Sequence, residues 1–144
     1  MHDGYGGISV KTILLLEDES SLMNLLRHVL KRNGYVIREA ASAEDAIRRC
    51  REVRCEIDLI LADVTLPVSS GIQIALLLRA EVPDLPVILM SGYPVTAWRA
   101  RDAADLKRLG SDSVIVLQKP FEPQTLLNSI RSLSGALYAV GRAG

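Results

Sequence analysis

Strand-like apolar runs alternate along this chain with amphipathic helical stretches, and no hairpin turn joins one run to the next. Strands that alternate with helices are connected by right-handed crossovers, which make the strands parallel and place helices on both faces of the sheet. The sequence therefore predicts an α/β fold with a doubly wound, five-stranded parallel sheet, a (βα)5 arrangement. The expected strands cover residues 13–16, 35–39, 57–62, 87–90 and 114–118.

The expected helices have recognisable first and last residues. Serine before an apolar helical pattern is a typical N-cap, and glycine typically ends a helix. The predicted starts are Ser20 or Ser21, a capping box over residues 42–45, Ser70-Gly71, Tyr93-Pro94 and Pro123; the predicted ends are Asn33-Gly34, Arg79 and Gly110.

The chain is expected to form one domain with short extensions. Its 144 residues are enough for a proper hydrophobic core. A composition of 49% hydrophobic but only 4% aromatic residues suits parallel strands packed between helices. We expect a flexible lead-in over residues 1–11, the folded domain over 12–134 and a frayed C-terminal tail over 135–144.

Charge and cysteine usage restrict the partners and the compartment. Seventeen basic and 17 acidic residues cancel, so no net field recruits nucleic acid or an anionic membrane. The apolar stretches are too short to span a bilayer. Cys50 and Cys55 do not have the spacing or the histidine neighbours of a metal site, and we expect free, partly buried thiols. These features predict a cytoplasmic protein that binds neither nucleic acid nor membrane directly.

Polar side chains follow four of the expected strands, at the point where each strand ends. Glu17 and Asp18 follow the first run, Asp63 the third, Ser91 the fourth and Lys119 the fifth. The carboxyl ends of parallel strands meet at one edge of the sheet, which is where such folds bind their ligands. We therefore expect these five side chains to form a single site.

The chemistry of this set points to a divalent cation and a phosphoryl group. Three carboxylates in one crevice repel one another unless a hard cation neutralises them, and Mg²⁺ prefers oxygen ligands. A backbone carbonyl just after Asp63 would complete such a site, and Mn²⁺ is an alternative ion. Asp63 is the candidate nucleophile that would form an acyl phosphate, while Lys119 and Ser91 contact the phosphoryl oxygens.

Each of these residues taken alone has an ordinary structural explanation. A strand-end aspartate is commonly a helix cap or turn residue, and Glu17-Asp18 could cap the next helix. Lys119-Pro120 and Ser91-Gly92 could be solvated turns. The functional interpretation depends on their occurring together at four strand ends, in order.

The segments ILLLEDES, LILADVTLPVSSG, VILMSGYP and LQKPFEPQTLL, between Thr12 and Leu133, resemble the receiver domain of two-component response regulators. The resemblance implies a flavodoxin-like sheet of strand order 2-1-3-4-5, with Asp63 as phosphoacceptor. It also implies Asp18 as a direct Mg²⁺ ligand, Glu17 as a ligand through water and the Thr65 carbonyl as the remaining protein ligand. Ser91 would be the switch hydroxyl, and Lys119 the phosphoryl-contacting lysine before a cis Lys119-Pro120 bond.

The same resemblance implies the partners and the reaction. The phosphoryl group would come from a phosphohistidine on a histidine kinase or a histidine phosphotransfer protein. The domain would catalyse only its own phosphorylation and dephosphorylation, and would signal by a conformational change. The segments VILMSGYP and LQKPFEPQTLL are most similar to receivers of hybrid sensor kinases. Relatives commonly dimerise through the last helix and strand, and the sequence leaves a homodimer open.

Two departures from the family pattern concern how the domain would signal its phosphorylation to a partner. The family's switch aromatic, three residues before the lysine, corresponds to Val116, which cannot swing between rotamers with a comparable effect. Extra length falls around residues 97–107. There Trp98 is expected to be either a core anchor or an exposed partner contact. His28 is expected to be a solvated surface residue.

Three other functions share part of this pattern. A haloacid-dehalogenase-like phosphatase also uses a nucleophilic aspartate, a hydroxyl, a lysine and Mg²⁺, but such enzymes resemble one another in a second acid where this chain has Thr65. A flavodoxin-like cofactor binder would need a phosphate-binding first loop, which Glu17-Asp18-Glu19 would oppose. A receiver-fold docking module without a productive switch stays open because of Val116.

Overall fold

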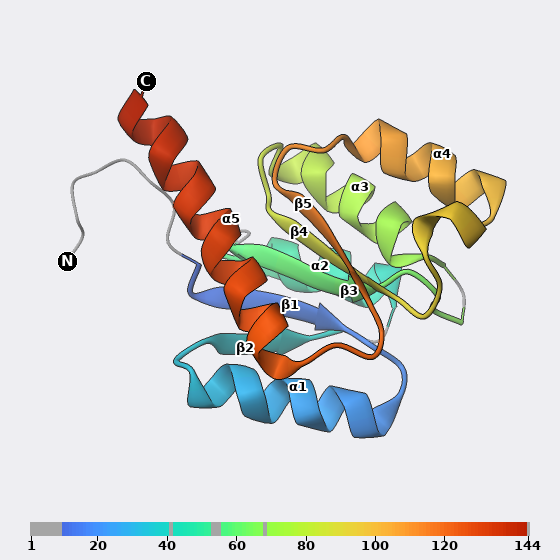
Figure 1. Ribbon diagram of the computed structural model, residues 1–144, viewed down its shortest axis with the longest axis horizontal. Helices are drawn as coiled ribbons and strands as arrows, with labels where there is room; N and C mark the ends of the chain where they lie inside the picture. The colour runs from blue at the N-terminus through green and yellow to red at the C-terminus, as the bar shows by residue number, and fades with distance from the viewer. Residues whose placement is uncertain (1–9, 41, 53–55, 68, 144) are drawn as a thin grey trace.

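The computed structural model describes residues 10–40, 42–52, 56–67 and 69–143, and its centre is a five-stranded, all-parallel sheet (Figure 1). The strand order is β2-β1-β3-β4-β5. The predicted fold class and strand order are therefore confirmed. The strands are β1 (Thr12–Leu16), β2 (Val36–Glu39), β3 (Leu59–Asp63), β4 (Val87–Ser91) and β5 (Val114–Gln118).

Helices cover both faces of the sheet. Figure 1 shows α1 and α5 on one face and α2, α3 and α4 on the other, and the two apolar clusters divide in the same way. The helices are α1 (Ser20–Arg32), α2 (Ala43–Glu52), α3 (Gly71–Glu81), α4 (Ala100–Leu109) and α5 (Pro123–Ala143), with a 3-10 turn, η1 (Val95–Ala97), before α4.

The side chains of β1 show why the strand-like runs are continuously apolar. Ile13 and Leu15 point into the cluster under α1 and α5, while Leu14 and Leu16 point into the cluster under α2, α3 and α4. All four side chains are fully buried. A strand with helices on both faces needs an apolar residue at every position, so the run does not alternate with polar residues.

Most helix ends lie where the sequence predicted them. Ser70 and Gln73 form a capping box at the start of α3, and Gly110 ends α4 with a φ of 85°. The cap of α1 is different: the N-cap is Glu19, whose Oε1 accepts a 2.6 Å hydrogen bond from the Leu22 N–H. The predicted serine caps are wrong because Ser20 already belongs to the helix, and an N-cap needs extended backbone.

The segment after β4 is not the single helix that was predicted from Tyr93-Pro94. A short turn, η1, comes first, and the chain then runs extended through Trp98 and Arg99 before α4 begins at Ala100. The C-terminal end also differs from prediction, because α5 continues past Ser134 to Ala143 and was expected to fray there. Its last turns extend beyond the edge of the sheet (Figure 1).

The prediction of free thiols is wrong for Cys50, which is buried at the end of α2 and disulfide-bonded. Cys55 is the one other cysteine of the sequence, and it lies outside the described residues. The cysteines thus give no argument for a reducing compartment.

A search of the described helices found none with the length and apolar character that crossing a membrane requires.

Candidate functional site

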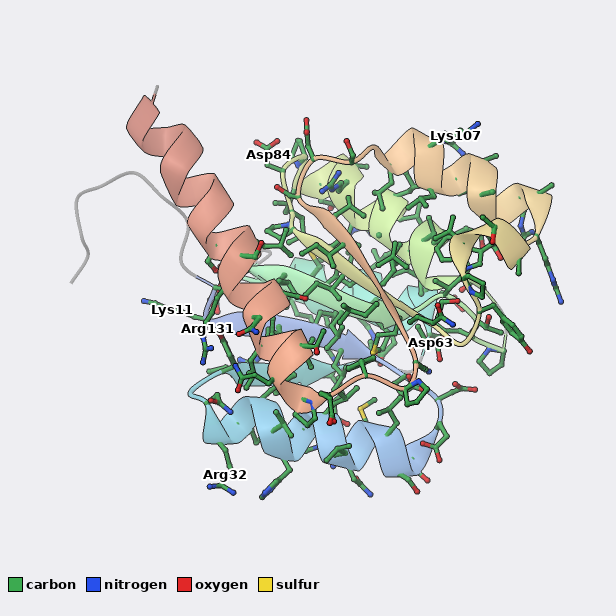
Figure 2. The ribbon with its side chains drawn as sticks, viewed as in Figure 1. Lys11, Arg32, Asp63, Asp84, Lys107 and Arg131 are labelled. Carbon is green, nitrogen blue, oxygen red and sulfur yellow. The ribbon has the colours of Figure 1, made fainter. Side chains whose placement is uncertain are left out.

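The carboxyl ends of the strands bring the predicted acidic residues together. Figure 2 shows Asp63 at the end of β3, at the edge of the sheet where β1 also ends. Glu17 and Asp18 directly follow β1, and one carboxylate oxygen from each of these three residues lies within 4.8 Å of the others. The predicted grouping of the three acids is therefore what the structure shows.

Lys119 joins two of these acids. Its Nζ donates a 2.6 Å hydrogen bond to Asp63 Oδ2 and a 2.9 Å hydrogen bond to Glu17 Oε1. The Glu17 side chain is 1% exposed, Asp63 8% and Lys119 22%, so the ion pairs are largely shielded from water. The backbone holds Lys119 in place, because its N–H donates to the Ser91 carbonyl at 2.7 Å. The Lys119-Pro120 bond is cis, as the resemblance implied.

Burial and hydrogen bonding shift the pKa values of Glu17 and Lys119. Burial raises the pKa of Glu17 above its ordinary value, although the hydrogen bond from Lys119 opposes the shift. Burial alone would lower the pKa of Lys119, but hydrogen bonds to Asp63 and Glu17 reverse this and the pKa is raised. Lys119 therefore stays a cation at neutral pH, where it can meet an incoming anion.

The donor set fits a hard divalent cation. Three carboxyl groups and one ammonium lie together in the site, so acidic groups outnumber the cation. Oxygen ligands with access to water are what Mg²⁺ requires, and Asp18 is exposed beside the two buried acids. Thr65 is exposed, and its N–H donates to Asp63 Oδ1 at 2.9 Å, which fixes the second oxygen of that carboxylate.

Ser91 lies at the end of β4, next to Lys119, but its hydroxyl is occupied elsewhere. Its Oγ donates to the Tyr93 carbonyl at 2.7 Å and accepts hydrogen bonds from the Tyr93 N–H at 3.1 Å and the Trp98 indole N–H at 3.0 Å. Neither expectation for Trp98 is complete: the half-buried ring packs against the core, and its N–H contacts a candidate site residue. No spacing rule in the sequence signals this contact.

Gly71 is a second residue whose role the sequence did not show. A Cβ at this first position of α3 would lie 2.3 Å from the Asp63 carbonyl oxygen and 2.8 Å from the Ala62 Cβ. The start of α3 therefore packs directly on the backbone that carries Asp63. The glycine after the Ser70 cap was the available signal, and it was interpreted only as a helix start.

Val116 is half-buried on β5 and lines a surface pocket with Val114 and Leu106. Its aliphatic side chain has no donor or acceptor, so it cannot hydrogen-bond to Ser91.

A buried, lysine-paired aspartate beside two further carboxylates, at the carboxyl edge of an α/β sheet, defines a protein that handles a phosphoryl group together with a divalent cation. The chain belongs to the response regulator receiver family: the family model described as "Response regulator receiver domain" matches residues 13–131. It is thus a receiver domain of two-component systems, and the phosphatase and cofactor-binder alternatives are set aside.

Individual relatives agree with this family. The chain is 32% identical over 122 residues to the sensor kinase CckA of Brucella abortus (strain 2308), covering 85% of this chain and 12% of the kinase. It is 32% identical over 121 residues to the transcriptional regulatory protein ResD of Bacillus subtilis (strain 168), covering 84% of this chain and 47% of ResD. The chain therefore spans half or less of the length of these relatives.

Solved structures show the same fold. A response regulator receiver protein from Sinorhizobium medicae WSM419 superimposes with a TM-score of 0.73 at 26% identity, covering 89% of this chain and 97% of the other. The receiver domain of the hybrid histidine kinase CckA superimposes with a TM-score of 0.68 at 27% identity, covering 85% and 97%.

Proposed function

We propose that Asp63 accepts a phosphoryl group from a phosphohistidine on a histidine kinase or histidine phosphotransfer protein, and that the domain then signals by a conformational change. The observation that carries this proposal is the placement of Lys119, whose ammonium bridges Asp63 and Glu17. A cation poised beside a nucleophilic carboxylate can pass to the phosphoryl oxygens as the negative charge moves there.

The transfer conserves atoms and charge. A carboxylate oxygen of Asp63 attacks phosphorus, the bond from phosphorus to the imidazole nitrogen breaks, and the imidazole leaves with its electron pair. Lys119 then exchanges its contact with Asp63 for a phosphoryl oxygen. Bound Mg²⁺, or Mn²⁺ in its place, would supply positive charge against the phosphoryl oxygens, held by Glu17, Asp18, Asp63 and the Thr65 carbonyl. Hydrolysis of the acyl phosphate would be the only other reaction of the domain.

Intact-mass analysis after incubation with acetyl phosphate tests the proposal. We expect the wild type to gain the mass of one phosphoryl group with Mg²⁺ present and none with excess EDTA, and Asp63→Asn to gain none. Asp84→Asn is the matched control, because Asp84 is exposed and far from Asp63 (Figure 2). If wild type and Asp63→Asn show the same mass change on incubation, the proposal is contradicted. If that change is zero, the domain would be a docking module.

A groove beside the site supports a helical partner. The groove has a volume of about 200 Å³, is lined mainly by apolar side chains and reaches Lys119, which contacts Asp63. An amphipathic helix in this groove would bring a histidine that it carries next to the phosphoacceptor. The lining residues are Leu22, Leu25, Leu26, Val29, Lys119, Pro120, Phe121, Pro123 and Leu126.

Leu25→Asp is expected to slow phosphoryl transfer from a phosphorylated histidine phosphotransfer protein about tenfold or more, because it places a charge in an apolar contact. The rate with acetyl phosphate should not change, since that donor needs no groove. Leu77→Asp on α3 is the control: Leu77 is 50% exposed and Leu25 49%. Equal slowing by both substitutions would show that the groove is not the docking site.

We further propose that the domain works in the cytoplasm, where ATP supplies the phosphoryl groups that histidine kinases pass on. The balanced charge of the chain favours a protein partner over direct binding of nucleic acid.

A further inference from the structure

The hydroxyl of Ser91 has no unused hydrogen-bonding capacity. A serine hydroxyl offers one proton and two lone pairs. The proton points to the Tyr93 carbonyl, and the lone pairs accept from the Tyr93 N–H and the Trp98 indole N–H. The indole N–H is shared, because it also donates to the Tyr93 carbonyl at 3.1 Å. Ser91 is 3% exposed, so water does not compete strongly for these contacts. Any new partner of this hydroxyl must displace an existing one.

A phosphoryl group on Asp63 would be such a partner. Its oxygens only accept hydrogen bonds, so Ser91 can contact one of them only by withdrawing its proton from the Tyr93 carbonyl. Turning the O–H toward the phosphoryl group also re-aims the lone pairs that face Trp98, and it leaves the Tyr93 carbonyl, at 3.1 Å, as the acceptor of the indole N–H. The two arrangements of Ser91 are therefore mutually exclusive.

We infer that Trp98 is a positioning residue that holds Ser91 away from the phosphoryl site. When Ser91 turns to phosphorylated Asp63, the indole N–H loses its bond to Ser91 and keeps only the Tyr93 carbonyl. This inference rests on the function proposed above. It assigns to Trp98 the aromatic part of the switch that Val116 on β5 cannot perform. The moving group also differs from the family's switch aromatic. The indole N–H of Trp98, on the β4–α4 connection, breaks its hydrogen bond to Ser91, and no side chain on β5 has to change its rotamer.

The position of Trp98 in the chain gives the release a structural consequence. Trp98 directly follows the η1 turn as its C-cap, and its backbone N–H donates to the Val95 carbonyl. The next residue, Arg99, is the N-cap of α4. Trp98 and Ser91 also line one pocket of about 360 Å³ together with the β3–α3 connection and the start of α4. Movement of the indole therefore reshapes this pocket and the first turn of α4, which is where a partner would detect phosphorylation.

The indole N–H resonance tests the inference directly. Trp98 is the only tryptophan, so a ¹⁵N-labelled sample gives a single indole cross-peak in a ¹H–¹⁵N spectrum. We expect Mg²⁺ alone to leave this peak in place. Mg²⁺ with beryllofluoride, an analogue of the phosphoryl group, should shift it, because the indole N–H loses Ser91 and keeps only the Tyr93 carbonyl as acceptor. Binding of beryllofluoride is followed separately by ¹⁹F NMR.

The two spectra distinguish the possible failures. A bound ¹⁹F signal with an unmoved indole peak would overturn the role of Trp98 and leave the proposed function intact. Absence of a bound ¹⁹F signal, together with no mass gain from acetyl phosphate, would overturn the proposed function and this inference with it.

Trp98→Phe gives a second, independent result. It removes the N–H donor but keeps an aromatic ring. Both arrangements lose the contact with the Tyr93 carbonyl, but only the unphosphorylated one also loses the hydrogen bond to Ser91. Affinity for beryllofluoride, measured by ¹⁹F titration, should rise about threefold to tenfold. Tyr93→Phe is the control, because it leaves in place the backbone groups that contact Ser91. An unchanged or weaker affinity of Trp98→Phe contradicts the inference, since mere damage to the loop would weaken binding.

Discussion

Replacing Lys119 with methionine is expected to slow phosphorylation of Asp63 by acetyl phosphate about 100-fold to 1,000-fold, and at the same time to tighten Mg²⁺ binding. The rate falls because the variant has no ammonium to stabilise charge on the phosphoryl oxygens. The metal binds more tightly because Lys119 Nζ no longer competes for Asp63 and Glu17, which it contacts at 2.6 and 2.9 Å. Intact-mass kinetics and Mg²⁺ titration calorimetry measure the two effects.

The same substitution should destabilise the metal-free domain at neutral pH. Glu17 and Asp63 would be left as buried carboxylates without their cation, a change that costs about 2–4 kcal/mol after allowing for the 22% exposure of Lys119. Burial already raises the pKa of Glu17, and losing the Lys119 hydrogen bond raises it further. A carboxyl group with a raised pKa in the folded state favours folding at low pH, so the deficit should shrink as the pH falls and Glu17 becomes protonated.

Urea unfolding with and without Mg²⁺ measures this deficit, and saturating Mg²⁺ should reduce it. Lys107→Met is the control, since Lys107 is an exposed residue of α4 far from Asp63 (Figure 2), and its stability should change by less than about 0.5 kcal/mol. If Lys119→Met is as stable as Lys107→Met and its Mg²⁺ affinity is unchanged, Lys119 does not neutralise Asp63 and Glu17 as described.

Gly71→Ala should be the most damaging single-methyl substitution in the site. The added Cβ would lie 2.3 Å from the Asp63 carbonyl oxygen and 2.8 Å from the Ala62 Cβ, and neither the backbone nor a Cβ can rotate away. Relief requires α3 to move off β3, so we expect a loss of about 3 kcal/mol in the free energy of unfolding. Asp63 would shift with the strand, and phosphorylation of the folded fraction should slow.

Gly92→Ala is the matched control for Gly71→Ala. An added Cβ at Gly92 would meet nothing within 4 Å, although this residue is next to Ser91. Urea unfolding of both variants should separate them by at least about 2 kcal/mol. Similar stabilities would show that α3 can adjust without cost, and that Asp63 is not fixed by the close approach of Gly71.

The sheet could be predicted from the sequence because its signal is local and redundant. The strands β1 and β3 are buried on both faces, so their runs over residues 13–16 and 59–62 had to be apolar at every position and stood out. The grouping of Glu17, Asp18 and Asp63 followed from the same fact, since parallel strands deliver their final residues to one edge.

The missed features depend on contacts that no local pattern encodes. The start of α4 at Ala100 follows from extended backbone at Trp98, whose indole bonds to Ser91, seven residues earlier. The clash that excludes a side chain at Gly71 exists only once α3 has packed on β3. Capping by Glu19 was missed because serines follow it directly, and sequence rules prefer serine at a helix start.

The central claim is that the phosphoryl group is attached to Asp63, and the most direct measurement is the position of the modified residue. Sodium borohydride reduces an aspartyl phosphate to homoserine, so the wild type is treated with acetyl phosphate and Mg²⁺, reduced, digested and sequenced by tandem mass spectrometry. We predict homoserine at position 63, with none in samples that contain EDTA. Homoserine at another acidic residue, or a phosphate retained on Ser91 or Thr65, would contradict the account.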